Sequence, residues 1–392
     1  GVILGGIPLK PSAPGELRQE QLEFRGRPET AGAAERISSA IEERIDFLRT
    51  LKGREMIKTA ALDLGGGLKP EETGVILSGI ADFIVEEVMK CAFELTGADY
   101  DAGGFAVMGL GRLGAGEMSY LSDLDLIFVF DDALLDAERF TRTVQKALHV
   151  LHAPSRLGKI YDTDMGLRPS GRQGTLVSSL SAFEEYHEKH VSPWEKFAIM
   201  KARFICGDTK TGCAGMRIIL DSLAETDADS LFVDQMHEMR QKMIKEIARE
   251  RGAFYNFKAG KGGLADVEFV CALLQLRNMN KDNPLVEQNT FRLMRNLFER
   301  KILNFEEFEV LYEGYGYLTS LKNRLGLFFS RPVDGIRLDG GDLAGITALL
   351  GYGRAEEGRK KFISDMKFFS GAINDIYSKK FRRRPELTGQ VW

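Results

Sequence analysis

The sequence predicts an α+β protein in which a small sheet stands between two helical regions. Two short apolar runs, residues 104–109 and 124–130, are bounded by turn residues and have the length of buried strands. Apolar residues recur every three to four positions both before and after these runs, which is typical of amphipathic helices. With 392 residues the chain exceeds what one hydrophobic core usually organises, so we expect two or three domains.

The N-terminal part is expected to be a flexible entry followed by two helices. The first thirty residues are rich in Pro and Gly and lack apolar periodicity, so we interpret them as a linker or extended arm. A helix is predicted over 31–64, and glycines 65–67 with Pro70 end it. A second helix is predicted over 71–95.

The remaining pattern predicts one more strand and then helices throughout. A helix over 137–152 follows the second strand, and a third strand is expected over 159–165. Further helices are predicted over 180–190, 193–206, 233–251, 264–278, 290–300, 305–325 and 358–378. We therefore divide the chain into an N-terminal linker and helices (1–98), a central domain that contains the strands (99–210) and a C-terminal all-α domain (211–392).

Composition argues against several classes of protein. The 53 Lys and Arg residues against 57 Asp and Glu leave a net charge of −4, without the basic field of a nucleic-acid binder. One basic cluster near the C-terminus is interpreted as a solvated helix end. No run approaches 18 apolar residues, so no membrane segment is expected. The four cysteines are scattered, which predicts buried thiols of a reduced, cytoplasmic protein. The basic cluster is Lys379, Lys380, Arg382, Arg383 and Arg384, and the cysteines are Cys91, Cys206, Cys213 and Cys271.

A glycine motif follows the first strand. Gly109, Gly111 and Gly114 match the G-x-G-x-x-G fingerprint of dinucleotide-binding proteins, and Asp131 and Asp132 stand where a ribose-binding acid belongs. That fold, however, needs a crossover helix between parallel strands. Only eight residues separate Gly114 from Asp123, so we disfavour the dinucleotide interpretation.

Two aspartates at the second strand suggest a metal site. Asp123 and Asp125 point to the same side of an extended chain, and Mg²⁺ prefers carboxylates combined with substrate phosphates. Acid-x-acid pairs should occur about eight times by chance in such a chain, so the spacing alone is weak. Because Asp125 interrupts an apolar strand, the context leaves two alternatives: a metal ligand, or a structural residue at the strand edge.

The order of strand, glycine turn and Asp-x-Asp strand is typical of polymerase-β-type nucleotidyltransferases. In that core the turn presents backbone N–H groups to a triphosphate, and the aspartates hold Mg²⁺. A third carboxylate is needed from a neighbouring strand, and the candidates are Asp162 and Asp164. Arg168 follows them and is a candidate phosphate ligand.

Four segments together resemble the glutamine-synthetase adenylyltransferases: GLGRLGAGEMSYLSDLDLIFVF, YDTDMGLRPSGRQGTLVSS, WEKFAIMKAR and GGLADVEF. Members of this family transfer AMP from ATP to a tyrosine of glutamine synthetase. The full-length family has two similar halves, one that removes AMP by phosphorolysis and one that adds it. The segment RPSGRQGTLVSSLSAFEEY is more similar to the C-terminal, adding half. The resemblance covers about residues 35–280.

The resemblance implies a set of site residues. Asp123, Asp125 and Asp164 would be the catalytic residues and would hold two Mg²⁺ ions. The residues implied to bind ATP are Gly109, Gly111, Arg112, Ser122, Arg168 and Lys201. Gly166 departs from the family, which usually has arginine there, so a phosphate contact from this segment would be reduced.

Other features keep alternatives open. Asp266 and Glu268 match the family's D-[IV]-E-F motif but lie at i and i+2, so one helix cannot direct both to one metal; they are either structural or at the rim of the site. Lys201 and Arg203 either face the triphosphate or form a structural salt bridge. The pairs His149/His152 and His187/His190 are expected to be ordinary histidines.

The implied partners are glutamine synthetase as the protein substrate and, in a regulatory role, a PII-type signalling protein. No nucleic acid and no membrane are expected as partners. Two other functions from the same family remain open: the AMP-removing half, and a regulatory piece without catalysis.

Overall fold

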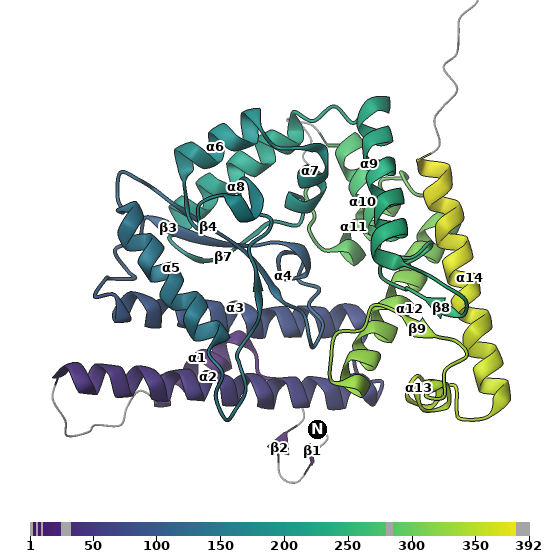
Figure 1. Ribbon diagram of the computed structural model, residues 1–392, viewed down its shortest axis with the longest axis horizontal. Helices are drawn as coiled ribbons and strands as arrows, with labels where there is room; N and C mark the ends of the chain where they lie inside the picture. Colours follow the sequence, from purple (N-terminus) through teal and green to yellow (C-terminus); the bar gives the residue numbers. More distant parts are fainter. Residues whose placement is uncertain (1–2, 5–6, 9–10, 25–32, 280–284, 382–392) are drawn as a thin grey trace, which may run out of the picture. The chain divides into compact units, whose positions relative to one another are not determined.

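The computed structural model describes residues 3–4, 7–8, 11–24, 33–279 and 285–381, and the chain divides into two compact units, Gly1–Leu223 and Ala224–Trp392 (Figure 1). The mixture of helices with small sheets confirms the α+β class. The finer three-part division, with boundaries at 99 and 211, stays a prediction.

The first unit is built on a mixed sheet. Its strands are β3 (Phe105–Gly109), β4 (Leu124–Phe130), β5 (Thr163–Asp164), β6 (Ser178–Ser179) and β7 (Arg203–Gly207). The spatial order is β5-β4-β3-β7, and β6 also pairs with β4. β3 is antiparallel to both β4 and β7, whereas β5 and β6 run parallel to β4. All of β3 is buried, which agrees with its continuous apolar run.

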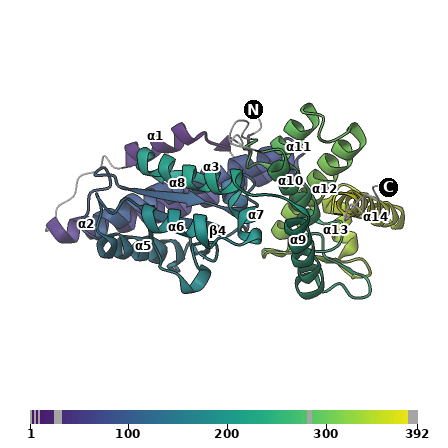
Figure 2. The same ribbon diagram turned by 90° about the horizontal axis from the view of Figure 1, so that it is seen from above.

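Helices surround this sheet. The long helices α2 (Ala33–Leu64) and α3 (Pro70–Leu95) lie side by side, and α3 also contacts α5 and β7 (Figures 1 and 2). Buried aromatic rings of α3, β3 and α5 meet in the core: Phe105 lies 4.7 Å from Phe93 and 5.5 Å from Phe140, between ring centroids. The other helices of this unit are α4 (Gly111–Ala115), α5 (Ala137–His152), α6 (Leu180–Lys189), α7 (Pro193–Ile199), α8 (Thr209–Ala224) and a 3₁₀ turn at Gly171–Gln173.

The predicted N-terminal linker is wrong for residues 14–24, which form α1 (Pro14–Phe24). Proline is well tolerated in the first turn of a helix, so Pro14 begins this helix rather than breaking it. Leu17 and Gln21, one turn apart, are both buried, and Arg18 forms a 2.8 Å ion pair with Glu86 of α3. Two further strands precede it, β1 (Ile3–Leu4) and β2 (Ile7–Pro8).

Two predictions near the sheet need correction. The helix expected over 193–206 ends at Ile199, and 203–207 form β7 because this segment adds to the free edge of β3. The third strand was expected over 159–165 but is limited to Thr163–Asp164. Ile160 and Tyr161 instead donate their N–H groups to the carbonyl of Leu151, at 3.1 and 3.2 Å, which holds this segment against the end of α5.

The second unit is mainly helical. Its longest helices, α12 (Phe305–Phe329) and α14 (Glu356–Lys380), contact each other, and each contacts α10 (Leu264–Arg277). This unit was expected to be all α. It also contains a short antiparallel pair of strands, β8 (Phe254–Tyr255) and β9 (Ile336–Arg337). The remaining helices are α9 (Ser230–Met243), which continues as a π-helix at Ile244–Ala248, α11 (Thr290–Glu299) and α13 (Leu343–Leu349).

The structure can also be compared with the expectations for the cysteines, the basic cluster and a membrane segment. All four cysteines are free thiols, and three are buried as expected, whereas Cys213 is exposed. Lys379 and Lys380 of the basic cluster lie 3.1 and 2.8 Å from Glu307, and the three arginines fall outside the described residues. None of the described helices is long and apolar enough to span a bilayer.

Candidate functional site

The parallel pairing of β4 with β5 brings two of the predicted aspartates together. Asp125 and Asp164 are direct partners across this pair, next to Leu124 and Thr163. Directly opposed residues share a face of the sheet, so both carboxylates leave it on the same side. Asp123 lies two residues before Asp125, on the side expected for the same face, and is exposed. The site is thus a carboxylate edge at the start of β4, defined by Asp123, Asp125 and Asp164.

The glycine turn lies against this carboxylate edge. Gly111 has a φ of +52°, which L side chains rarely adopt. A Cβ atom there would lie 2.1 Å from Oδ2 of Asp125, so any side chain would displace the carboxylate. Leu110 donates its N–H to the carbonyl of Asp125 at 2.9 Å. Backbone atoms of the turn therefore reach the carboxylate edge without an intervening side chain.

The third glycine of the motif has a packing role. A Cβ atom on Gly114 would lie 1.9 Å from the carbonyl oxygen of Lys201 and 2.5 Å from that of Gly109. The turn and the segment leading into β7 can approach this closely only because position 114 lacks a side chain. The spacing of the glycines is thereby explained without a dinucleotide.

Strand pairing excludes the dinucleotide-binding fold. The G-x-G-x-x-G fingerprint requires the strands on either side to be parallel and joined by a crossover helix. Here the flanking strands β3 and β4 are antiparallel, and α4 spans only Gly111–Ala115. This agrees with the argument from the short connection.

The carboxylate edge meets part of the requirement for Mg²⁺. Among the described residues, no group of three His, Cys, Asp or Glu side chains lies close enough to hold a metal ion. Two carboxylates on neighbouring strands are nevertheless the type of donor that Mg²⁺ uses together with substrate phosphates and water. The oxygen chemistry and the adjacent glycine turn therefore fit an ion that is completed by a bound nucleotide.

Asp164 is held in place locally. Its Oδ1 accepts a hydrogen bond from the backbone N–H of Gly166 at 2.7 Å. A Cβ atom at position 166 would lie 3.0 Å from the same oxygen, a tight contact. The absence of a side chain at Gly166 leaves room for this close approach of the Asp164 carboxylate.

Arg168 supports the loop that follows Asp164. Its guanidinium donates to the carbonyl oxygens of Met165, Arg172 and Gly174, at 2.8, 3.0 and 3.3 Å. These bonds tie both ends of the 165–174 loop to one side chain. A contact between Arg168 and phosphate stays a prediction, whereas its role in ordering the loop is visible in the structure.

The other predicted ATP-binding residues lie around the glycine turn. Ser122 Oγ accepts from the N–H of Ser119 at 2.9 Å and therefore orders the turn before Asp123. Arg112 is half-buried in α4, and the Nζ atom of Lys201 lies 3.8 Å from a carboxylate oxygen of Glu117. Direct contacts of these three residues with ATP remain predictions.

Arg203 was expected either to face the triphosphate or to form a structural salt bridge, and in the structure it forms the salt bridge. It makes two hydrogen bonds with Asp82 of α3, at 2.8 and 2.9 Å, and donates to the carbonyl oxygens of Leu113 and Gly114. One guanidinium thus joins α3, the end of α4 and β7. Because bidentate arginine–carboxylate pairs have a fixed geometry, this contact holds the glycine turn in position.

Lys52 of α2 supports the segment before Asp164 and was not identified from the sequence. Its Nζ lies 3.8 Å from the centroid of the Tyr161 ring and donates to the carbonyl of Ile160. Burial lowers the pKa of Lys52 to about 8. More than a hundred residues separate it from Tyr161, so no local pattern reveals the contact. It anchors the segment that leads to Asp164.

The acid-x-acid pair in the second unit has a structural role. Asp266 is buried, and its Oδ1 accepts from Nε of Arg240 at 2.7 Å. Arg240 also donates to the carbonyl oxygens of Ala259 and Gly260, at 2.9 and 2.7 Å. Glu268 accepts from the hydroxyl of Tyr315 at 3.2 Å. Of the two alternatives for Asp266 and Glu268, a structural role or a place at the rim of the site, these contacts support the structural role.

Comparison with known proteins matches the chain to two family models and to curated relatives. The family model described as glutamate-ammonia ligase adenylyltransferase matches residues 15–217, and the model described as GlnD PII-uridylyltransferase matches 234–378. Two curated relatives, from Nitrosococcus oceani and Shewanella loihica, are 29% and 30% identical over 310 and 312 residues. Both are named bifunctional glutamine synthetase adenylyltransferase/adenylyl-removing enzyme.

The alignments cover most of this chain but a smaller share of each relative. The alignments cover 73% of this chain and 32% of each relative, so the chain spans about a third of the length of these relatives. The carboxylate edge and the glycine turn both lie inside the first matched region. The matched model describes an adenylyltransferase, which is a nucleotidyltransferase by class. The chain belongs to the glutamate-ammonia ligase adenylyltransferase family.

Proposed function

We propose that this chain transfers AMP from ATP to a tyrosine of glutamine synthetase, in a reaction that requires Mg²⁺, and that its first unit is a polymerase-β-type core. The pairing of Asp125 with Asp164 beside Gly111 is the observation that carries the proposal. Both relatives are named for this activity. The resemblance of the segment 168–186 to the adding half favours that half over the removing one.

Each group of residues has a separate task in the proposed reaction. Asp123, Asp125 and Asp164 would hold Mg²⁺ only together with phosphate oxygens of the nucleotide, and the bound ion would neutralise charge on the triphosphate. The turn at Gly109–Gly111 would present backbone N–H groups to the phosphates. Arg203 and Lys52 are positioning residues, because they hold the turn and the segment before Asp164.

The chemistry is an in-line displacement at the α-phosphorus of ATP. The tyrosine oxygen forms a bond to this phosphorus while the bond to the bridging oxygen of the β-phosphate breaks, and pyrophosphate leaves. The tyrosine O–H loses its proton in the same process. Asp164, the exposed carboxylate contributed by the neighbouring strand β5, would favour this deprotonation.

The direct test uses the chain, Mg²⁺, α-labelled ATP and unmodified glutamine synthetase. We expect label on the synthetase, and we expect Asp125→Asn to lower the rate at least a thousandfold. Asp162→Asn is the matched control, because this neighbouring acid pairs with Lys159 at the surface and should retain most of the activity. Equal loss in both variants would contradict the assignment of Asp125.

The second candidate is the AMP-removing reaction, since the relatives are named as bifunctional. It would release ADP from adenylylated synthetase in the presence of phosphate, and it would depend on the same aspartates. Release of ADP without labelling in the forward assay would replace the adding function with the removing one. Inactivity in both directions would favour a regulatory module. The match of 234–378 to a PII-uridylyltransferase model supports testing PII-type proteins in that case.

A further inference from the structure

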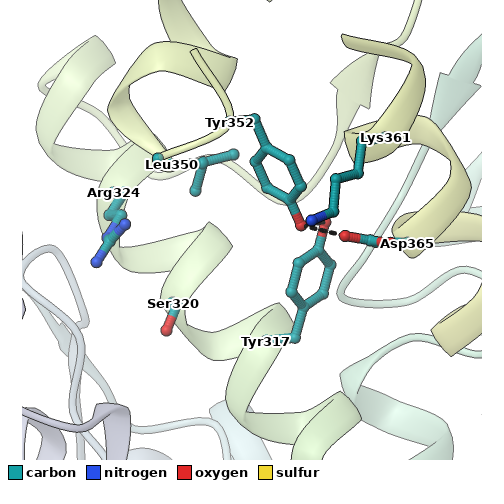
Figure 3. Close-up of a pocket in the computed structure, with 8 residues that line it drawn as sticks. Tyr317, Ser320, Arg324, Leu350, Tyr352, Lys361 and Asp365 are labelled. Atoms are coloured by element: carbon teal, nitrogen blue, oxygen red, sulfur yellow. Dashed lines mark hydrogen bonds between the residues drawn. The ribbon is translucent and has the colours of Figure 1, made fainter. Parts of the chain in front are cut away.

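A cavity lies within the second unit, and none of the residues that line it is among those assigned to nucleotidyl transfer. It has a volume of about 450 Å³ and is formed by α12, the turn after α13 and α14 (Figure 3). Tyr317, Ser320 and Arg324 lie on one face of α12, at spacings of three and four residues. Leu350, Gly351 and Tyr352 contribute from the turn after α13, and Lys361 and Asp365 from successive turns of α14. Cavities that bind small molecules have volumes of about 300–1,000 Å³.

Two tyrosines and one aspartate form a connected wall. The hydroxyl of Tyr352 donates to Oδ2 of Asp365 at 2.8 Å and lies 3.5 Å from the hydroxyl of Tyr317. Figure 3 shows these three polar groups meeting near Lys361. Burial raises the pKa of Tyr317, and it raises that of Tyr352 to about 12. Both hydroxyls therefore stay protonated near neutral pH and act as hydrogen-bond donors or acceptors.

The charged lining is predominantly basic. Arg324 and Lys361 are cationic, whereas Asp365 is the single acid among the residues that line the cavity. Asp365 is engaged by Tyr352, and Lys361 makes no ion pair with any residue that the structure describes. Arg324 is held along its wall by a hydrogen bond to the carbonyl of Leu349 at 3.3 Å. The two cations come from different helices and both line the same space.

We propose that this cavity binds a small organic anion, a phosphate ester or a carboxylate, with its charge at Arg324 and Lys361 and its body against the tyrosine rings. Arginine pairs with both phosphates and carboxylates in a bidentate geometry, and lysine adds a point charge. The aromatic rings and Leu350 offer an apolar surface for the uncharged part of the molecule. The site is a binding site separate from the proposed transfer reaction and does not depend on it.

Calorimetric titration of the full chain tests the proposal with three probes: inorganic phosphate, ribose 5-phosphate and citrate. We expect saturable binding of at least one organic probe, and the stronger one identifies the anion as phosphate or carboxylate. Lys361→Gln should weaken binding about tenfold, which is the usual effect of losing one charge-assisted hydrogen bond. Lys367→Gln, an exposed lysine on α14 that does not line the cavity, is the matched control and should leave affinity unchanged.

A second variant tests the sign of the charge. Asp365→Asn keeps an acceptor for Tyr352 and removes the negative charge, so an anion should bind more tightly, by about threefold or more. Thermal denaturation of each variant shows whether the fold is retained. Loss of probe binding in Asp365→Asn without loss in Lys361→Gln would show that the charge of the anion does not lie at the basic residues, and would overturn the proposal. Absence of saturable binding by all three probes would also overturn it.

Discussion

The same acid-x-acid spacing occurs in both units, as Asp123/Asp125 in the first and Asp266/Glu268 in the second, but the surroundings of the two pairs differ. In the first unit, Asp123 is exposed and Asp125 half-buried at the start of a strand. In the second unit, Asp266 is 1% exposed on a helix, and its partner Arg240 is 0% exposed. A carboxylate that keeps contact with solvent can accept a metal ion and a substrate. A carboxylate enclosed with an arginine is already neutralised, so it stabilises the fold instead.

Burial has a visible electrostatic effect in the second unit. Enclosure raises the pKa of Asp266, and the neighbouring Arg240 opposes this shift. The charge of Arg240 would be left uncompensated if the carboxylate were removed, since the guanidinium also donates hydrogen bonds to the carbonyl oxygens of Ala259 and Gly260, which are neutral. Substitution of Asp266 should therefore lower the stability of the fold far more than substitution of Asp123.

The largest expected effect on stability comes from Asp266→Ala. Removing one partner of a buried ion pair leaves an uncompensated charge and typically costs about 3–5 kcal/mol. Chemical denaturation of the full chain should show this loss in the free energy of unfolding. Asp123→Ala removes an exposed carboxylate and should change stability by about 0.5 kcal/mol or less. Similar losses in both variants would remove the distinction between the two pairs.

Gly111→Ala should reduce activity more than stability. The new Cβ atom would displace the carboxylate of Asp125, and a misplacement of about 1 Å can lower a rate about a hundredfold. The positive φ of Gly111 adds a conformational cost of about 1–2 kcal/mol. Rates of AMP transfer and denaturation midpoints measured on the same preparation separate the two effects. Gly116→Ala is the control, because φ is also positive there but no atom lies within 4 Å of the new methyl group.

The smallest effect concerns His187, a buried histidine for which burial outweighs the opposing charge of Glu195. Burial lowers the pKa of His187 to about 4, below its usual value of 6.5. The unfolded chain binds this proton more readily, so stability should fall as pH drops from about 6.5 towards 4. Between pH 7.5 and 5 the loss from this histidine should be about 1–2 kcal/mol.

His187→Leu isolates this contribution. Unfolding free energies of the native chain and the variant, measured at pH 7.5 and pH 5, should show a smaller dependence on pH in the variant. His190 is exposed at the end of the same helix, so His190→Leu should retain the native dependence. Equal dependence in the native chain and in His187→Leu would show that other groups cause the acid sensitivity.

Long, regular elements were predictable because their signals are local. The helix over 137–152 was predicted with the bounds that it has, because apolar residues recur there at helical spacing. In the structure the Asp136 side chain also caps its first turn. The helix at Pro14–Phe24 and the strand at Arg203–Gly207 were missed. Both depend on distant partners, α3 in the first case and the edge of β3 in the second.

The sequence by itself determined the candidate chemistry of this protein: the glycine turn, the aspartates that follow it and the family to which they belong. Local spacing and residue type carry this information along a short stretch of chain. The tertiary structure decided which acids meet, because the register of β4 with β5 opposes Asp125 to Asp164. It also decided that Asp266 is enclosed with Arg240 and that Arg203 binds Asp82. Burial and pairing depend on residues far apart in sequence, so only the folded chain specifies them.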